Sequence, residues 1–387
     1  MRVLITAVGH RTEHWTDFFA ILGARPEVEL TLLLADVSSQ TELSLGGSGG
    51  GEAAMKMHVL PHLLGEARSG HMASIVFAPG PLRQLEADRP DVVHIIGEAA
   101  YLSTWQLLRW CRRRWPGVPV SLYAAQNIVT RFPPPFPWLE RRAYKSVSHA
   151  LPITPAALHV LQAKGYRGPA TIVPLGVDTR RFNPAAPSPD GRFTVGFVGR
   201  LEPHKGIATL LAAVEPLDVD LLVVGRGSLS PLVQAAASRR PDRVRLVDWA
   251  DHEQLPALLR RMSVLVLPST EVVQRNVLPW IGIPLREQFG RVLVEAMACG
   301  VPVIGSDLGE IRHVVGPAGL TVPPDDATSL GGAIARLRDD PALARQLGEA
   351  GISRARGEFS WDRAIARTID VWRDLAAARA VAVGNER

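Results

Sequence analysis

Strand-like apolar runs that alternate with helical segments constrain the fold of this chain more than any other feature of its sequence. In the first half the predicted strands are Val3–Ala7, Glu29–Ala35, Val92–Ile96, Val120–Ala124, Ala150–Thr154 and Thr171–Val173. In the second half they are Thr194–Val198, Leu221–Val224, Val244–Val247, Val264–Leu267, Val303–Ser306 and Leu320–Val322. This alternation is typical of parallel strands joined by crossover helices. It predicts an α/β protein built from doubly wound parallel sheets.

A proline-rich stretch at residues 183–189 separates the two series of strands and helices. A chain of 387 residues is long enough for two domains. We therefore predict two Rossmann-like domains that face each other across a cleft, one over residues 1–183 and one over residues 190–360. Ligands of such folds bind at the carboxyl ends of the strands, so the cleft is the expected site.

The composition points to a globular protein without a membrane span. No apolar run approaches the roughly 18 residues that a spanning helix needs. The apolar part of the N-terminus, from Val3 to Ala7, is too short for a signal peptide. Two cysteines, Cys111 and Cys299, make no disulfide framework and have no metal-ligand spacing around them. These features predict a cytoplasmic protein.

The positive charge of the chain lies entirely in its first half. Residues 1–183 hold 19 Lys and Arg against 14 Asp and Glu, whereas residues 184–387 hold 24 of each. An anionic partner is therefore expected on the side of the first domain.

Two carboxylates, Glu287 and Glu295, flank the start of an apolar helix that ends at Gly300. A carboxylate among apolar residues usually has a specific partner. At about 1.5 Å of rise per residue, the two groups are separated by roughly 12 Å along the axis. Between them the helix N-terminus offers N–H groups to an anion. Two diols on either side of a phosphate group fit this arrangement, and that is the chemistry of a nucleotide sugar.

A second candidate segment follows the strand Thr194–Val198. There Gly199 and Gly206 let the backbone come close to a ligand, and Arg200 and Lys205 can neutralise a diphosphate. Taken alone, this segment reads as a solvated loop with incidental charge. Together with the Glu287–Glu295 segment it favours a phosphate-binding site.

These two segments resemble the retaining glycosyltransferases of family four, the glycosyl transferases group 1. The resemblance is carried by Gly199-Arg200-Leu201, Lys205-Gly206, Glu287-Gln288-Phe289-Gly290 and Glu295 through Val303. It is specific in the second half of the chain and covers the first half only in general plan. It implies the GT-B fold, with an acceptor-side first domain, a donor domain and a last helix at residues 361–380 that crosses back to the first domain. The alternative for that helix is an ordinary last helix of the second domain.

The resemblance also implies roles for individual residues. Arg200 and Lys205 would bind the diphosphate, and Glu295 would bind the ribose. Glu287 and the backbone of residues 288–290 would bind the donor sugar. The whole donor-binding set implied is Gly9, Arg200, Lys205, Gly225, Gln288, Phe289, Gly290, Arg291, Val292 and Glu295. The catalytic candidates are Glu287, Gln126, Asn127 and His94, and no metal ligand is expected.

The first domain departs from the family pattern at two places. Many members have a Gly-Gly loop after strand one, where this chain has Gly9 and His10. Many have a His after the strand that starts near Val120, where this chain has Gln126 and Asn127. These amides can bind a sugar hydroxyl, but neither is a usable base at neutral pH. His94 and His10 are each either cleft residues or structural histidines.

Other segments leave alternatives open. Asp218 and Asp220 resemble a metal-binding pair, but they precede a strand and are expected at the amino end of the sheet. Residues 225–228 either approach the nucleotide or form a plain turn. Residues 270–285, with Trp280, form an insertion that either sets specificity or is a variable loop. Residues 45–51 form a surface connection or a lid.

The segment Trp105–Trp115 mixes tryptophan with clustered arginine. It either lies on an anionic membrane surface or is a crossover helix with a basic solvent face. No nucleic-acid recognition module is visible. The proline-rich residues 131–136 are expected to shape the acceptor side.

The sequence thus predicts a metal-independent, retaining hexosyltransferase that uses a UDP- or GDP-sugar. The acceptor is expected to be a small molecule or a lipid-linked sugar, and peripheral contact with the inner membrane face is the alternative to a purely cytoplasmic location. Two other classes stay open. A non-hydrolysing sugar-nucleotide epimerase shares the architecture, and a non-catalytic sugar-binding subunit would keep the fold without the phosphate grip.

Overall fold

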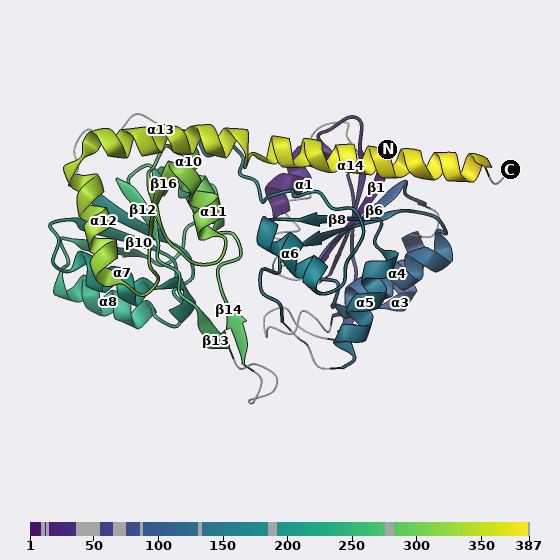
Figure 1. Ribbon diagram of the computed structural model, residues 1–387, viewed down its shortest axis with the longest axis horizontal. Helices are drawn as coiled ribbons and strands as arrows, with labels where there is room; N and C mark the ends of the chain where they lie inside the picture. The colour runs from purple at the N-terminus through teal and green to yellow at the C-terminus, as the bar shows by residue number, and fades with distance from the viewer. Residues whose placement is uncertain are drawn as a thin grey trace. The chain divides into compact units, whose positions relative to one another are not determined.

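The computed structural model describes residues 1–8, 12, 15–35, 55–64, 75–85, 88–130, 134–184, 192–274 and 282–385. The chain divides into two compact units (Figure 1). The first unit consists of Met1–Pro174 together with Ala364–Arg387, and the second consists of Leu175–Arg363. Each unit is described by itself below.

The first unit is built on a six-stranded parallel sheet of order β3-β2-β1-β6-β7-β8. Its strands are β1 (Arg2–Val8), β2 (Glu29–Ala35), β3 (Lys56–Val59), β6 (Val92–Ile96), β7 (Val120–Ala124) and β8 (His149–Pro152). The central strands are buried along their whole length, as expected for a parallel sheet covered on both faces. A short hairpin of β4 (His62–Leu64) and β5 (Val76–Phe77) stands beside this sheet.

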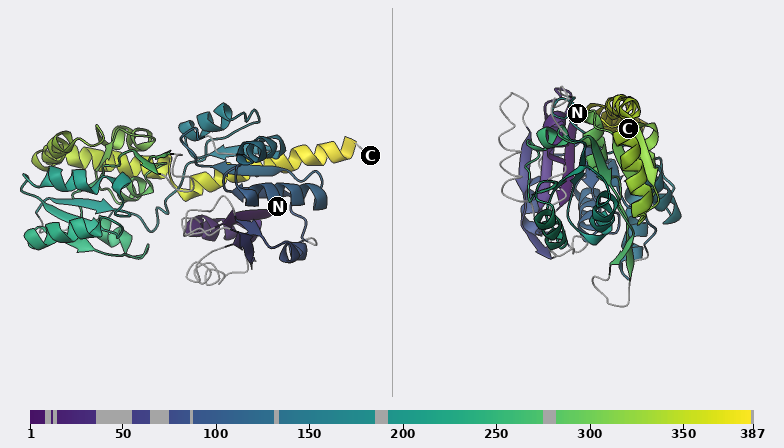
Figure 2. Two further views of the ribbon diagram at one scale, coloured as in Figure 1. Left: turned by 90° about the horizontal axis from the view of Figure 1, so that it is seen from below. Right: turned by 90° about the vertical axis from the view of Figure 1, so that its left-hand side faces the viewer.

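Helices cover both faces of this sheet (Figures 1 and 2). They are α1 (Thr16–Gly23), α3 (Pro79–Leu82), α4 (Leu102–Arg114), α5 (Phe136–Ser146), α6 (Pro155–Ala163) and the part of α14 (Trp361–Asn385) from Ala364 onward. Leu107, Leu108 and Cys111 of α4 join Val93 and Ile95 of β6 in one apolar core. Trp372 of α14 packs on the other face of the same strand, against His94.

The second unit repeats this plan with a six-stranded parallel sheet of order β11-β10-β9-β12-β15-β16. Its strands are β9 (Thr194–Val198), β10 (Asp220–Val224), β11 (Val244–Val247), β12 (Val264–Leu267), β15 (Val303–Ser306) and β16 (Gly319–Val322). After β12 the chain forms an antiparallel hairpin of β13 (Val272–Gln274) and β14 (Ile283–Leu285).

Two groups of helices pack against this second sheet (Figure 1). One group comprises α7 (Ile207–Val214), α8 (Ser230–Arg239) and α12 (Ala327–Asp339). The other comprises α9 (Leu255–Leu259), α10 (Arg291–Ala298), α11 (Ile311–Val315) and α13 (Pro341–Gly357). Leu210 of α7, Val223 of β10 and Leu330 of α12 are all buried in the same core.

The predicted α/β architecture with two parallel sheets is confirmed. All six predicted strands of the second half are present, and β10 and β16 each start one residue earlier than predicted. The predicted strand Thr171–Val173 is wrong. These residues are extended and donate two backbone hydrogen bonds to Ala150 and Pro152, but Pro169 and Pro174 flank them and cannot donate to a ladder.

The break between the compact units falls at residues 174/175, ahead of the proline-rich stretch where the sequence places it. The reason is that the segment after residue 174 is bound to the second unit. The Val177 amide donates to the Phe359 carbonyl over 2.8 Å, the Trp361 amide donates to the Val177 carbonyl over 3.1 Å, and Phe182 is buried.

The basic segment after Trp105 forms most of α4 and has the geometry of a crossover helix. Its buried face carries Leu107, Leu108 and Cys111, while Arg109 and residues 112–114 are exposed. Within the part of the chain that the structure describes, no helix is long and apolar enough to cross a membrane. The loop at residues 45–51, Trp280 of the insertion and residues 131–133 lie outside the described residues.

Candidate functional site

The predicted site residues of the second unit gather where β9, β10 and β12 end and α10 begins. Arg200 follows the last residues of β9 and is exposed. Its guanidinium makes no ion pair with a carboxylate of the described residues, although it lies close enough to Glu202 to lower the pKa of that group. An exposed cation of this kind remains available to an anionic ligand.

Glycines allow the loops after the strands to touch through their backbones. Gly206 has a φ of 70°, and a Cβ added there would lie 1.7 Å from the Pro268 carbonyl oxygen. Gly225 has a φ of 138°, and a Cβ there would lie 2.0 Å from the Gly199 carbonyl oxygen. At both positions only glycine fits without moving backbone.

A carboxylate ties the loop after β9 to the loop after β10. The Ser228 hydroxyl donates to Glu202 Oε2 over 2.7 Å, and the Ser228 amide donates to Glu202 Oε1 over 3.2 Å. The Ser228 hydroxyl holds the pKa of Glu202 below its usual value, with smaller help from Arg200. The segment 225–228 is therefore more than a plain turn, because it orders the loop that carries Arg200.

Lys205 and Glu287 form an ion pair at the centre of the site. Lys205 Nζ lies 2.5 Å from Glu287 Oε2, and their side chains are only 17% and 12% exposed. Glu287 also accepts hydrogen bonds from the Gly290 amide (3.2 Å) and the Ser269 hydroxyl (3.4 Å). Burial disfavours the charged form of Glu287, but the charge and hydrogen bond of Lys205, with smaller contributions from His204 and the Gly290 amide, together lower the pKa of the carboxyl. Glu287 is thus an anion held in place just before the start of α10.

Glu295 lies one turn inside α10, and its side chain is only 6% exposed. Its Oε1 atom lies 2.8 Å from Arg291 Nε and 3.3 Å from His252 Nε2. Arg181 Nη1 lies 2.9 Å from the other ring nitrogen of His252. Arg291 Nη2 also lies 2.9 Å from His252 Nε2. Because a guanidinium can only donate, each ring nitrogen of His252 faces an arginine donor, and Nε2 lies beside the Glu295 carboxylate as well.

The remaining predicted donor residues lie around the start of α10. Gly290 is the N-cap in a left-handed conformation, with a φ of 75°. Gln288 and Val292 are half-buried. Phe289 is 2% exposed and packs edge-on against Phe359, with ring centroids 5.6 Å apart. Its side chain therefore anchors the loop in the core, and only its backbone is free to serve a ligand.

In the first unit, Gln126 lies in the loop after β7 and is held by a buried lysine. Lys164 Nζ donates to Gln126 Oε1 over 2.7 Å and to Glu140 Oε1 over 2.9 Å. Tyr144 donates its hydroxyl to the same Glu140 oxygen over 3.2 Å. Burial and the Glu140 charge raise the pKa of Tyr144, so it stays a donor. Asn127 is half-buried beside this cluster.

Of the two alternatives for His94, a cleft residue or a structural histidine, the structure supports the second. His94 is the third residue of β6, is 1% exposed and lies under Trp372, with ring centroids 5.4 Å apart. Its Nδ1 atom lies 2.9 Å from the Ser121 hydroxyl oxygen, which also accepts from Trp372 Nε1 over 3.0 Å. Burial lowers the pKa of His94 to about 3. It is a neutral core residue, which leaves Gln126 and Asn127 as the first-unit candidates.

Gly9 and His10 lie outside the described residues. Asp218 and Asp220 are at the amino end of β10, as the sequence predicts. Asp218 pairs with Arg192 and Arg243, and Asp220 Oδ1 lies 3.3 Å from Arg192 Nε. Among the described residues no group of three or more His, Cys, Asp or Glu is placed to hold a metal ion.

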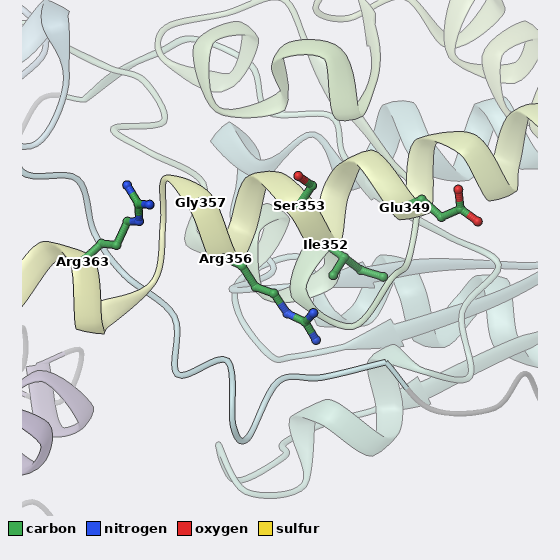
Figure 3. A pocket seen from close by; sticks show the side chains of 6 residues that line it. All are labelled: Glu349, Ile352, Ser353, Arg356, Gly357 and Arg363. Atoms are coloured by element: carbon green, nitrogen blue, oxygen red, sulfur yellow. The ribbon is translucent and has the colours of Figure 1, made fainter.

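Two hollows in the second unit lie away from these loops. One, of about 630 Å³, runs along the C-terminal half of α13, where Ile352 and Arg356 project from the helix (Figure 3). It is lined by Glu349, Ile352, Ser353, Arg356, Gly357 and Arg363. The other, of about 420 Å³, lies at the amino ends of β9, β10 and β11. Neither is lined by a residue of the loops after β9 and β10 or of the segment before α10.

Three residues of the site were not found from the sequence. His252 contacts Glu295 from a position far from it in the chain, and Arg181 contacts His252 in turn. Ser269 reaches Glu287 from the end of β12. The only available signal for Ser269 was its place directly after a predicted strand. His252 and Arg181 follow no pattern of spacing.

Comparison with known proteins places this site in a family. Residues 178–354, within the second unit, match the model of the family described as glycosyl transferases group 1. The glycogen synthase of Mycobacterium tuberculosis is 32% identical over 219 residues, which cover 54% of this chain and 49% of that protein. The MMP α-(1→4)-mannosyltransferase of Mycolicibacterium hassiacum is 32% identical over 289 residues, which cover 71% of this chain and 62% of that protein.

The fold also matches solved structures. The Anabaena protein Alr3699/HepE, solved in complex with UDP, aligns over 96% of this chain and 99% of its own with a TM-score of 0.72. At 16% sequence identity this likeness shows the fold alone. The chain spans about half of the glycogen synthase and somewhat more of the mannosyltransferase. With its two parallel-sheet units the chain has the GT-B fold, and residues 178–354 of its second unit match the glycosyl transferases group 1.

Proposed function

We propose that this protein transfers a sugar from a nucleoside diphosphate sugar to an acceptor hydroxyl. The observation that carries the proposal is the convergence of Arg200, Lys205 and Glu287 in front of α10. Two cations, one of them exposed and without an ion pair among the described residues, stand beside a fixed carboxylate and a helix N-terminus. This arrangement suits a diphosphate with a sugar attached to its outer phosphate.

In this proposal Arg200 and Lys205 bind the diphosphate, and the first amides of α10 contribute N–H groups to it. Glu295 binds the ribose hydroxyls in place of one of its present partners. Glu287 and the backbone at residues 288–290 bind hydroxyls of the donor sugar. Gly225 lets the loop after β10 approach the nucleotide. A UDP- or GDP-sugar is the proposed donor, and the UDP complex of Alr3699/HepE supports testing UDP first.

The proposed reaction keeps the anomeric configuration of the donor. The bond between the anomeric carbon and the phosphate oxygen breaks, and the acceptor oxygen bonds to the same face of that carbon. The departing phosphate oxygen takes the acceptor proton, so no protein nucleophile is needed. The cations of the site stabilise the negative charge that builds up on the diphosphate in the transition state, as the donors of an oxyanion hole do in other enzymes.

Metal independence is part of the proposal. The charge on the leaving diphosphate is met by Arg200 and Lys205, while Asp218 and Asp220 are engaged with Arg192 at the amino end of β10. Gln126 and Asn127 of the first unit are proposed to contact the acceptor hydroxyl. The acceptor itself is proposed to be a small molecule or a lipid-linked sugar.

A thermal-shift screen tests the donor assignment directly. A ligand that binds only the native state stabilises it by mass action, so a true donor raises Tm in proportion to its affinity. UDP-, GDP- and TDP-sugars are compared with the free nucleoside monophosphates, which lack the second phosphate. The proposal predicts a larger shift with one diphosphate series. Equal shifts with monophosphates and diphosphates in every series would contradict it.

Retention is tested separately by ¹H NMR of the product formed from an α-linked donor. An α-linked product supports same-face substitution, and a β-linked product contradicts it. Conversion of the donor sugar to its epimer without an acceptor would instead identify the epimerase class.

A further inference from the structure

An arginine-rich hollow lies at the opposite end of the second sheet from the proposed donor site. It has a volume of about 420 Å³ and is formed where β9, β10 and β11 begin and where the chain approaches β12. Its charged lining consists of Arg192, Arg243, Arg245, Arg260 and Arg261, with Asp220 and Asp242 as the acidic members. A concave space of this size suits a small ligand.

Two of these arginines are fixed by aspartates. Arg243 Nη1 lies 2.5 Å from Asp218 Oδ1, and Arg192 contacts the same oxygen while its Nε atom lies 3.3 Å from Asp220. The paired arginines hold the pKa of Asp218 below its usual value, so it is ionised at neutral pH. Fixed guanidiniums present their remaining N–H groups in a defined direction, which is the preorganisation that phosphate recognition uses.

A third arginine is held without any acidic partner. Arg260 donates from Nε to the Asn183 carbonyl and from Nη2 to the Asn183 side-chain oxygen, each over 2.8 Å. These neutral acceptors orient the guanidinium and leave its charge uncompensated. Arg245 and Arg261 are exposed and form no ion pair with the described residues. Even with Asp218 included, the hollow therefore keeps a net positive charge.

We infer that this hollow is a second anion site of the protein, distinct from the donor site, and that it takes a small anion with at least two phosphate groups. A single phosphate would leave guanidiniums of the lining unmatched, whereas a diphosphate or a sugar bisphosphate can engage the fixed arginines and the exposed pair together. A macromolecular surface is a poorer fit, because the arginines line a concave space instead of an extended face.

The test is calorimetry with inorganic pyrophosphate on three double variants of the full chain and on the quadruple variant that combines the first two. Arg200→Ala/Lys205→Ala removes the two cations proposed to bind the diphosphate in the donor site and leaves the hollow intact. Arg245→Ser/Arg261→Ser removes the two exposed guanidiniums of the hollow, whose lack of ion pairs among the described residues makes loss of folding unexpected. Arg112→Ser/Arg113→Ser, on the exposed face of α4, changes the net charge by the same amount elsewhere.

We expect the Arg200/Lys205 variant still to bind pyrophosphate. The quadruple variant, which also carries Arg245→Ser and Arg261→Ser, should bind it at least tenfold more weakly. The Arg112/Arg113 variant should bind like the wild type. Loss of all pyrophosphate binding in the Arg200/Lys205 variant would overturn the second site while leaving the donor site standing. Equal binding with and without Arg245 and Arg261 would also overturn it.

A hexose bisphosphate provides a second probe at the same site. Its two phosphates are separated by a sugar, so it reports whether the lining accepts spaced groups. The site is supported if either anion binds more tightly to the Arg200/Lys205 variant than to the quadruple variant, which also lacks Arg245 and Arg261. Binding of neither anion contradicts it, whatever the outcome at the donor site.

Discussion

Lys205 Nζ and Glu287 Oε2 lie 2.5 Å apart, although 82 positions separate the two residues in the chain. The contact joins the loop after β9 to the segment before α10, so the cation proposed for the diphosphate and the carboxylate proposed for the sugar are already side by side. Breaking one partner of a shielded pair leaves the other charge unmatched. A Lys205 substitution therefore changes phosphate binding and also leaves the Glu287 carboxylate without its ion pair. Arg200 is the cleaner probe of phosphate binding.

We predict that Arg200→Ala weakens nucleoside diphosphate binding by about 1.5–3 kcal/mol, the scale of a charge-assisted hydrogen bond. Because Arg200 is exposed and makes no ion pair with the described residues, the thermal stability of the free protein should barely change. Isothermal calorimetry measures the affinity. Arg239→Ala, an exposed arginine on α8, is the matched control. Unchanged affinity in Arg200→Ala would remove this residue from the site.

Glu295→Gln should weaken binding of the nucleoside diphosphate itself, because its proposed partner is the ribose. Glu287→Gln should leave diphosphate binding nearly intact and lower kcat, because its proposed partner is the transferred sugar. Diphosphate affinity and steady-state kinetics of both variants decide this. The reverse pattern, with binding lost only in Glu287→Gln, would mean that the donor lies in the opposite orientation.

Gly206→Ala should disrupt the site through the backbone. The new Cβ would lie 1.7 Å from the Pro268 carbonyl oxygen at a φ of 70°, so the loop after β9 must move. We expect a loss of at least about 2 kcal/mol in the free energy of unfolding together with weaker donor binding. Gly332→Ala on the exposed side of α12 meets no atom within 4 Å and should gain up to about 1 kcal/mol. Urea denaturation compares the two, and equal stabilities would refute the strain argument.

The low pKa of His94 makes folding stability depend on pH. Burial depresses the folded pKa from 6.5 to about 3, so the unfolded chain binds the proton over that window and the folded chain does not. The contribution of neutral His94 to the free energy of unfolding is complete above pH 6.5 and is lost as pH falls toward 3. Over that range the free energy of unfolding falls by at most about 1.4 kcal/mol per pH unit.

His94→Gln removes this titration, so the stability difference between wild type and variant should shrink as pH falls below 6.5. Urea denaturation at a series of pH values measures it. His159→Gln, at an exposed position of α6, controls for the loss of one histidine. Parallel stability profiles of wild type and His94→Gln would show that His94 does not titrate as a buried group.

Activity should survive EDTA, because Arg200 and Lys205 are proposed to neutralise the leaving diphosphate. Turnover is measured after dialysis against the chelator and again after addition of Mg²⁺ or Mn²⁺. Complete loss with EDTA that either ion restores would show that a metal takes this role.

The second unit could be predicted well from the sequence because its signals are local. Each of its sheet strands is a short apolar run, and Arg200 and Gly225 of the proposed donor site follow the ends of β9 and β10 closely. The hairpin of β13 and β14 and the short strands β3, β4 and β5 were missed, because strands of two to four residues carry little periodicity.

The errors at single residues have the same origin. The sequence leaves His94 open as a cleft residue, because the Trp372 side chain that covers it comes from α14, in the last part of the chain. The contact of His252 with Glu295 and that of Arg181 with His252 depend on tertiary packing and leave no pattern in the chain.

The most direct test of the account is release of nucleoside diphosphate from a nucleotide sugar, with and without an acceptor. The wild type should release the diphosphate only when an acceptor hydroxyl is supplied. Glu287→Gln should release it far more slowly while it still binds the free diphosphate. Diphosphate release that does not depend on an acceptor, or turnover in Glu287→Gln equal to that of the wild type, would contradict the proposed transfer reaction and the place of Glu287 in it.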